Sequence, residues 1–115
     1  MLTRFESFSA YAPLDIEENN EGVIVVAEVP GVKKEDVKVS LEHGVLSIGG
    51  ERKPQGPSGN ARGLVREHRL GKFQRTVRLP YEVDAAAVSA ELSDGLLRIV
   101  LPKAEAAKPK EIVIR

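Results

Sequence analysis

The sequence predicts an all-β domain, because a pattern typical of a β-hairpin occurs in it twice. Residues 29–48 and residues 79–101 both begin with an apolar residue and a proline, and both contain L-x-x-G-[VL]-L-x-I, which starts at Leu41 and at Leu92. Alternating apolar residues on both sides of a glycine indicate a hairpin, and a preceding proline fits a loop that leads into a sheet. Chance similarity is the alternative, but matched positions at fixed offsets favour a genuine repeat.

Two further strands are predicted ahead of the first hairpin. Leu14 and Ile16 alternate with acidic residues, which indicates a strand over residues 14–18 with one wet face, and the Asn-Asn-Glu-Gly segment that follows predicts a turn. Residues 23–29 are β-branched and apolar on both faces at their start. We therefore expect a central strand there, covered on both sides.

After the first hairpin the regular pattern stops. Residues 49–63 are rich in glycine and proline and predict a long loop, which in a compact domain indicates either a function or disorder. Leu64 and Val65 form a short apolar island at its end. A further strand is predicted over residues 73–79, with Arg75 on the otherwise apolar side, where a buried cation calls for a carboxylate partner.

Both ends of the chain carry apolar residues outside these strands. In residues 1–13 an apolar residue recurs at every third position, roughly one helical stripe, and these side chains are candidate contacts for partners or apolar clients: Leu2, Phe5, Phe8 and Tyr11. A frayed terminus that packs on its own domain is the alternative. Residues 103–111 are a charged, alanine-rich tether, after which Ile112 and Ile114 project to one side of an extended segment, unless this end is simply disordered.

Composition limits the function. The chain has 115 residues, no cysteine, and 17 basic against 17 acidic residues. It is therefore one domain without disulfides or thiolate chemistry, and it has no general attraction to nucleic acid or membranes. No secretory or membrane-spanning segment is evident, so a cytoplasmic protein is the default expectation. No nucleotide, metal-ligand or hydrolase motif occurs, so we expect neither an enzyme nor a cofactor.

Charge is distributed unevenly along the chain. Residues 51–78 are strongly basic, whereas residues 15–21 are acidic and contain no base. The basic strip could bind nucleic acid, but Phe73 is its only aromatic residue, so recognition by stacking is poorly supported. Pairing of the two segments is favoured, within one chain or between two, with the strand at residues 14–18 as the acceptor.

From Pro13 onward the sequence resembles the small heat-shock protein family. The shared marks include V-P-G-V at residues 29–32, G-V-L-S-I at residues 44–48, G-K-F at residues 71–73 and A-x-L-x-D-G-L-L at residues 90–97. The family usually has a longer arm before Pro13, and it usually has valine where this chain has Leu96.

The resemblance implies an α-crystallin domain, an immunoglobulin-like β-sandwich, over residues 13–103, with a short N-terminal arm at residues 1–12 and an extended C-terminal tail at residues 104–115. It implies a homodimer of the bacterial and plant type, in which the loop strand of one copy pairs with the first strand of its partner, and it places Arg75 at the interface. The residues of this exchange would be Leu64, Val65, Arg66, Glu67, Arg69 and Arg75 on the donor side and Leu14, Asp15, Ile16 and Glu17 on the acceptor side.

The resemblance also implies a higher homo-oligomer, in which the C-terminal I-x-I anchor docks in a groove of another dimer. The anchor would be Ile112, Val113 and Ile114, and the groove would be formed by Val37, Val39, Leu41, Val88, Ala90 and Leu92. The implied function is that of an ATP-independent chaperone, a holdase that binds unfolding proteins and limits their aggregation. A CS-domain-like co-chaperone, which binds a single partner without general holdase activity, is the alternative.

Overall fold

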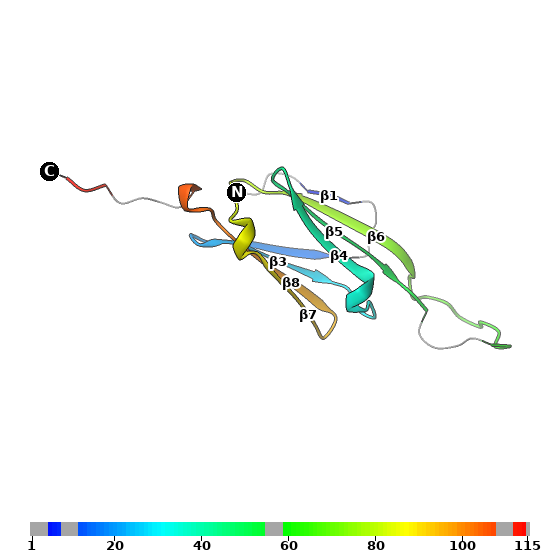
Figure 1. The fold of residues 1–115 in the computed structure, drawn as a ribbon. Helices are drawn as coiled ribbons and strands as arrows, with labels where there is room; N and C mark the ends of the chain where they lie inside the picture. The colour runs from blue at the N-terminus through cyan, green and yellow to red at the C-terminus, as the bar shows by residue number, and fades with distance from the viewer. Residues whose placement is uncertain (1–4, 8–11, 55–58, 108–111, 115) are drawn as a thin grey trace.

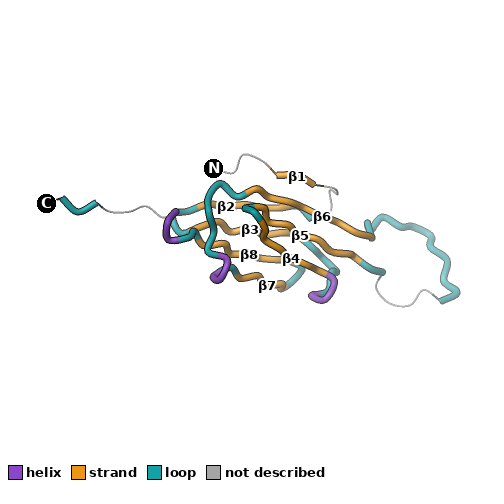
Figure 2. The backbone as a smooth tube through the Cα atoms, turned by 45° about the horizontal axis from the view of Figure 1, so that its top comes forward, coloured by secondary structure: helices purple, strands orange, loops and turns teal. Residues whose placement is uncertain are grey.

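Two antiparallel four-stranded sheets pack face to face in the computed structural model, which describes residues 5–7, 12–54, 59–107 and 112–114 (Figures 1 and 2). Within these residues the strand order is β1-β6-β5-β4 in one sheet and β2-β3-β8-β7 in the other. The expected all-β sandwich is therefore confirmed. The strands are β1 Phe5–Ser7, β2 Leu14–Glu18, β3 Gly22–Glu28, β4 Val37–Glu42, β5 Val45–Arg52, β6 Gly71–Arg78, β7 Ser89–Ser93 and β8 Leu96–Pro102, with short 3-10 turns η1 Lys34–Asp36, η2 Ala85–Ala87 and η3 Glu105–Ala107.

The repeated sequence pattern forms two equivalent hairpins, β4–β5 and β7–β8, one in each sheet. Their two-residue turns are His43-Gly44, with φ of 52° and 75°, and Asp94-Gly95, with φ of 54° and 77°. Positive φ at both turn residues matches the right-handed twist of the strands, and glycine at the second position adopts it without strain. The hairpins predicted from the sequence are confirmed.

The core lies between the sheets and is built from alternate residues of the central strands. Its largest fully buried members are Val23, Val25, Leu46, Ile48, Val77, Ile99 and Leu101. Strand β3 is central, between β2 and β8, as predicted. Only its inner face is fully covered, however, because Ile24 and Val26 on the outer face are half-buried. The expectation that both faces of β3 are fully covered is wrong for the outer face, because no further layer of the described chain packs over it.

The predicted loop begins later than residue 49. Strand β5 continues to Arg52 and pairs with β6 up to Gly71. A β-carbon on Gly50 would lie 2.7 Å from the carbonyl oxygen of Asp36 and 2.7 Å from Cζ of Phe73. Glycine therefore marks a close approach within a strand here, which a pattern of loop-forming residues cannot reveal.

The N-terminal arm differs from the expected helical stripe. Phe5–Ser7 is a β-strand that pairs antiparallel with β6, and this part of the arm therefore packs on its own domain. Three of the proposed client contacts, Leu2, Phe8 and Tyr11, lie outside the described residues. Spacing by three residues was a weak signal because an edge strand can form wherever a neighbouring strand leaves its hydrogen-bonding groups open.

Candidate functional site

An apolar groove lies between the edge strands β4 and β7. Its volume is about 190 Å³, and its lining combines four of the predicted groove residues with two that the sequence did not indicate: Val37, Val39, Ala90 and Leu92, with Lys34 and Leu97. The predicted residues Leu41 and Val88 are absent from this lining, although they pack, partly buried, against the core as Val37, Val39 and Leu92 do. The resemblance to a known family supplied the predicted lining on β4 and β7. Lys34 was not indicated because it belongs to the 3-10 turn before β4.

The C-terminal anchor residues lie far from this groove. Ile112 and Ile114 are 85% and 92% exposed, and the segment extends away from the sandwich (Figure 1). Val113, between them, is exposed as well. Side chains of this size are normally withdrawn from water, so residues 112–114 form an apolar stretch that the described part of its own domain does not cover.

A second open edge is formed by β2, at the end of its sheet. Leu14 and Ile16 pack against the core, while Asp15 and Glu17 are exposed. An edge strand presents unpaired backbone groups to any chain that approaches it. The β2 edge thus lies open among the described strands, with acidic side chains exposed along it.

The candidate donor, the loop between β5 and β6, projects from the sandwich at the end opposite to the tail (Figures 1 and 2). Leu64 and Val65 are 82% and 75% exposed. The loop residues Arg66, Glu67 and Arg69 are exposed too. None of the described strand pairings joins this loop to β2 of the same chain. The structure therefore does not bring the predicted donor and acceptor together within one copy.

Arg75 is 7% exposed and lies on the inner face of β6. Its Nη1 donates a hydrogen bond of 2.6 Å to the carbonyl oxygen of Ala12, just before β2. A backbone carbonyl thus accepts one of the hydrogen bonds from the buried guanidinium that we expected a carboxylate to accept. Burial lowers the pKa of Arg75, because removal from water disfavours the charged form. The bond links the two sheets next to the β2 edge.

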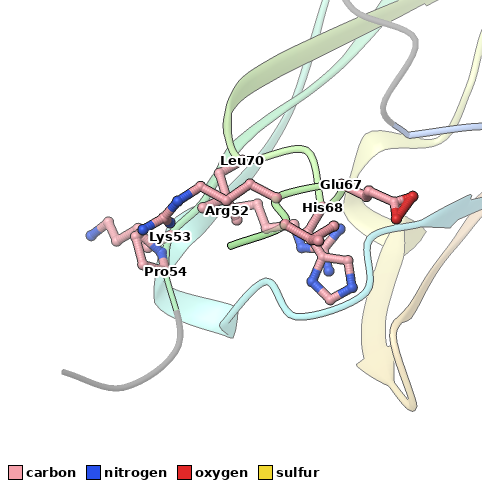
Figure 3. A pocket seen from close by; sticks show the side chains of 8 residues that line it. Arg52, Lys53, Pro54, Glu67, His68 and Leu70 are labelled. Carbon is pink, nitrogen blue, oxygen red and sulfur yellow. The ribbon is translucent and has the colours of Figure 1, made fainter. Parts of the chain in front are cut away.

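A basic pocket of about 470 Å³ lies where β5 meets the returning loop (Figure 3). Its lining residues are Arg52, Lys53, Pro54, Val65, Arg66, Glu67, His68 and Leu70. Lys53 Nζ lies 3.0 Å from Asp36 Oδ1, and the pKa of Lys53 is raised by this hydrogen bond and by the charge of Asp36. Much of the lining belongs to the exposed loop, so the pocket lacks the enclosed, converging groups that catalysis needs.

In the part of the chain that the structure describes, His, Asp and Glu side chains nowhere gather in a group of three or more that could hold a metal ion. The same residues include no helix with the length and apolar character required to cross a membrane.

Comparison with known proteins identifies the family to which this sandwich belongs. The model of the Hsp20/alpha crystallin family matches residues 15–115. Heat shock protein 16 of Schizosaccharomyces pombe is 38% identical in an alignment 124 positions long, which covers 93% of this chain and 85% of that protein.

Solved structures agree with this assignment. Heat shock protein 16.0 from Schizosaccharomyces pombe superimposes with a TM-score of 0.79 at 36% identity, covering 93% of this chain and 99% of that one. A small heat-shock protein from Xylella fastidiosa, described as having a distinct high order structure, gives a TM-score of 0.73 at 35% identity and covers 90% of this chain and 95% of that one. The α-crystallin sandwich expected from the sequence is thereby confirmed, and the chain belongs to the Hsp20/alpha crystallin family of small heat-shock chaperones.

Proposed function

We propose that this protein is an ATP-independent holdase that binds unfolding proteins and limits their aggregation, and that it acts as dimers assembled into oligomers. The observation that carries the proposal is the coexistence of an exposed I-x-I segment with an apolar groove that the described part of its own tail does not occupy. Such a segment and groove fit capture of an extended peptide, in which pockets for alternate side chains set the register. A tail from another copy is the natural occupant.

The dimer would form at the other open edge. The exposed loop, with its apolar residues Leu64 and Val65 and its basic residues Arg66 and Arg69, would add a strand to β2 of a partner copy. Asp15 and Glu17 on β2 favour a basic donor by charge complementarity. Because each copy carries one donor and one acceptor, two copies satisfy both edges with twofold symmetry.

Assembly then gives multivalency. Each tail–groove contact is small, but many act together in an oligomer, so weak individual contacts produce a stable and exchangeable assembly. Holdase action needs no further chemistry. A protein that binds non-native chains competes by mass action with their self-association.

The experiment is light scattering of a thermolabile enzyme heated alone and with this protein, in the absence of ATP. Suppression of scattering at equimolar subunits is expected, and heat-stable serum albumin at the same concentration serves as the control for crowding. Scattering that equals that of the albumin control would contradict the holdase proposal.

A CS-domain-like module is the second candidate, and the sandwich alone would suit it. It has no use for an exposed loop strand or for the I-x-I tail. The mass of the full chain and of a chain that ends at Lys103 separates the two proposals. A holdase of the proposed kind forms an assembly larger than a dimer that the truncation reduces, whereas a CS-like module stays monomeric in both forms.

A further inference from the structure

The shortest strand of the sandwich closes one of its edges. Strand β1 has 3 residues and β6 has 8. The two strands pair Phe5 with Val77, Glu6 with Thr76 and Ser7 with Arg75. On its other side, β6 is paired with β5 along its whole length. Among the described residues, β1 therefore covers only a part of the outer edge of β6.

A ladder this short is easily replaced. The net gain from each backbone hydrogen bond is of the same order as the entropy lost when one residue is ordered, so a strand of this length adds little stability by itself. An extended segment that paired with β6 from Gly71 to Arg78 would form a longer ladder than β1 does. Competition for this edge therefore favours the longer incoming strand.

The face of β6 that points into the sandwich determines which segments fit. Phe73 and Val77 are buried on that face. Residues directly opposite one another in an antiparallel pair share a face of the sheet. An incoming strand with apolar side chains at alternate positions would place them beside Phe73 and Val77, and unfolding proteins expose segments of this kind.

We propose that β1 is a displaceable cap, and that an extended apolar segment of an unfolding protein takes its place on the edge of β6. This inference rests on the proposed holdase function and names the place where a client binds. The tail and the loop of this chain already have matching surfaces in the groove and on β2. At the outer edge of β6, by contrast, the described chain provides only the short strand β1 as a partner.

The test is a disulfide that fixes the cap. The chain has no cysteine, so Glu6→Cys with Thr76→Cys introduces one pair at opposite positions of β1 and β6. Opposite residues of antiparallel strands have Cα atoms about 4.5–5.5 Å apart, which is within the range that a disulfide spans. The matched control is Ser40→Cys with Ser47→Cys, also opposite one another, in the β4–β5 hairpin that the proposal leaves closed.

Protection of heated malate dehydrogenase is measured by light scattering for the oxidised and reduced forms of both variants. Oxidation of the β1–β6 pair is expected to raise the amount of protein needed for protection by about tenfold or more, because the edge no longer opens to competitors. Oxidation of the control pair is expected to leave the amount of protein needed for protection unchanged. In a second readout, p-benzoylphenylalanine replaces Gln74, which is exposed on β6, and is expected to crosslink to the heated enzyme only when the cap is reduced.

Equal protection by both forms of the β1–β6 variant, with the Gln74 crosslink retained, overturns the displaceable cap and leaves the holdase function standing. If the unsubstituted protein also fails to protect, the holdase function is wrong. Absence of the crosslink from position 74 to the heated enzyme would overturn the displaceable cap independently of that result. Disulfides found between two copies on non-reducing gels would show that another copy, rather than a client, takes this edge.

Discussion

Arg75 and Ala12 are tied across the sandwich by a hydrogen bond of 2.6 Å from the guanidinium Nη1 to the backbone carbonyl oxygen. Arg75 comes from the strand β6 of one sheet, and Ala12, which is fully buried, precedes β2 of the other. The bond therefore fixes the point at which β2 begins. In the proposed dimer, β2 is the acceptor for the partner's loop, so the same bond positions the interface.

Replacing Arg75 should destabilise the fold. Arg75→Ala is expected to lower the free energy of unfolding by about 2 to 4 kcal/mol, because it leaves a buried carbonyl without this donor. The control is Arg78→Ala on the same strand, where the side chain is exposed and the expected change is within about 0.5 kcal/mol. Urea titration followed by circular dichroism measures both. Equal midpoints for the two variants would contradict a structural role for the buried guanidinium.

Two adjacent glycines of β5 should respond differently to alanine. A β-carbon on Gly50 would come within 2.7 Å of the Asp36 carbonyl oxygen, whereas one on Gly49 would have its nearest contact at 3.8 Å. Gly50→Ala is expected to cost about 1 to 3 kcal/mol through overpacking. Gly49→Ala should be neutral or slightly stabilising, since alanine reduces the entropy of the unfolded chain. Thermal melts of the two variants provide the comparison, and similar losses for both would refute the close approach.

The tail anchor should control assembly size. Ile112→Ala with Ile114→Ala is expected to reduce the assembly to dimers in native mass spectrometry, because each buried isoleucine contributes about 2 kcal/mol to docking. Ala106→Ser, at an exposed position of η3 outside the anchor, is the control and should preserve the full mass. An unchanged mass for the double variant would count against docking of the tail.

The groove should be blocked by a bulky charge that leaves the fold intact. Ala90 is exposed and lines the groove, so Ala90→Arg is expected to give dimers of normal thermal stability. Glu91→Arg, the next residue of β7, places the same side chain on the opposite face of the strand and should preserve the oligomer. Size-exclusion chromatography with light scattering distinguishes the two. The groove would be excluded as the docking site if both variants kept the full mass.

Tyr81 should limit stability at alkaline pH. Its hydroxyl is buried without a hydrogen-bond partner among the described residues, and burial, with a smaller effect of Glu18, raises its pKa. Because the folded-state pKa lies above the unfolded value of about 10, the contribution of neutral Tyr81 is complete below that pH and is lost as the pH rises through the folded-state pKa. Tyr81→Phe should remove this loss.

At neutral pH the same substitution should leave stability unchanged or raise it by up to about 1 kcal/mol, since an unsatisfied buried hydroxyl disappears. Urea midpoints between pH 7 and pH 11 test both statements. A parallel decline for Tyr81→Phe and the unsubstituted protein above pH 10 would assign the alkaline loss to other groups.

Much of the fold could be predicted locally because each signal lies within one short window. The two hairpins were predicted from alternation around Gly44 and Gly95, and both turns have the positive φ that glycine favours. The turn before β3 was predicted from Asn19, whose side-chain oxygen accepts hydrogen bonds from the backbone amides of Glu21 and Gly22. The errors concern β1 and the second half of β5, where pairing with β6 outweighs local composition.

Alternation along the chain was enough to predict the hairpins, the central position of β3, the inward arginine and the paired isoleucines of the tail. The folded structure was needed to show that Lys34 and Leu97 complete the lining of the groove, that Ala12 receives the hydrogen bond of Arg75 and that Phe5–Ser7 pairs with β6. These contacts join residues far apart in the sequence. They form when the two sheets bury a common core, and no local pattern specifies which distant groups that burial brings together.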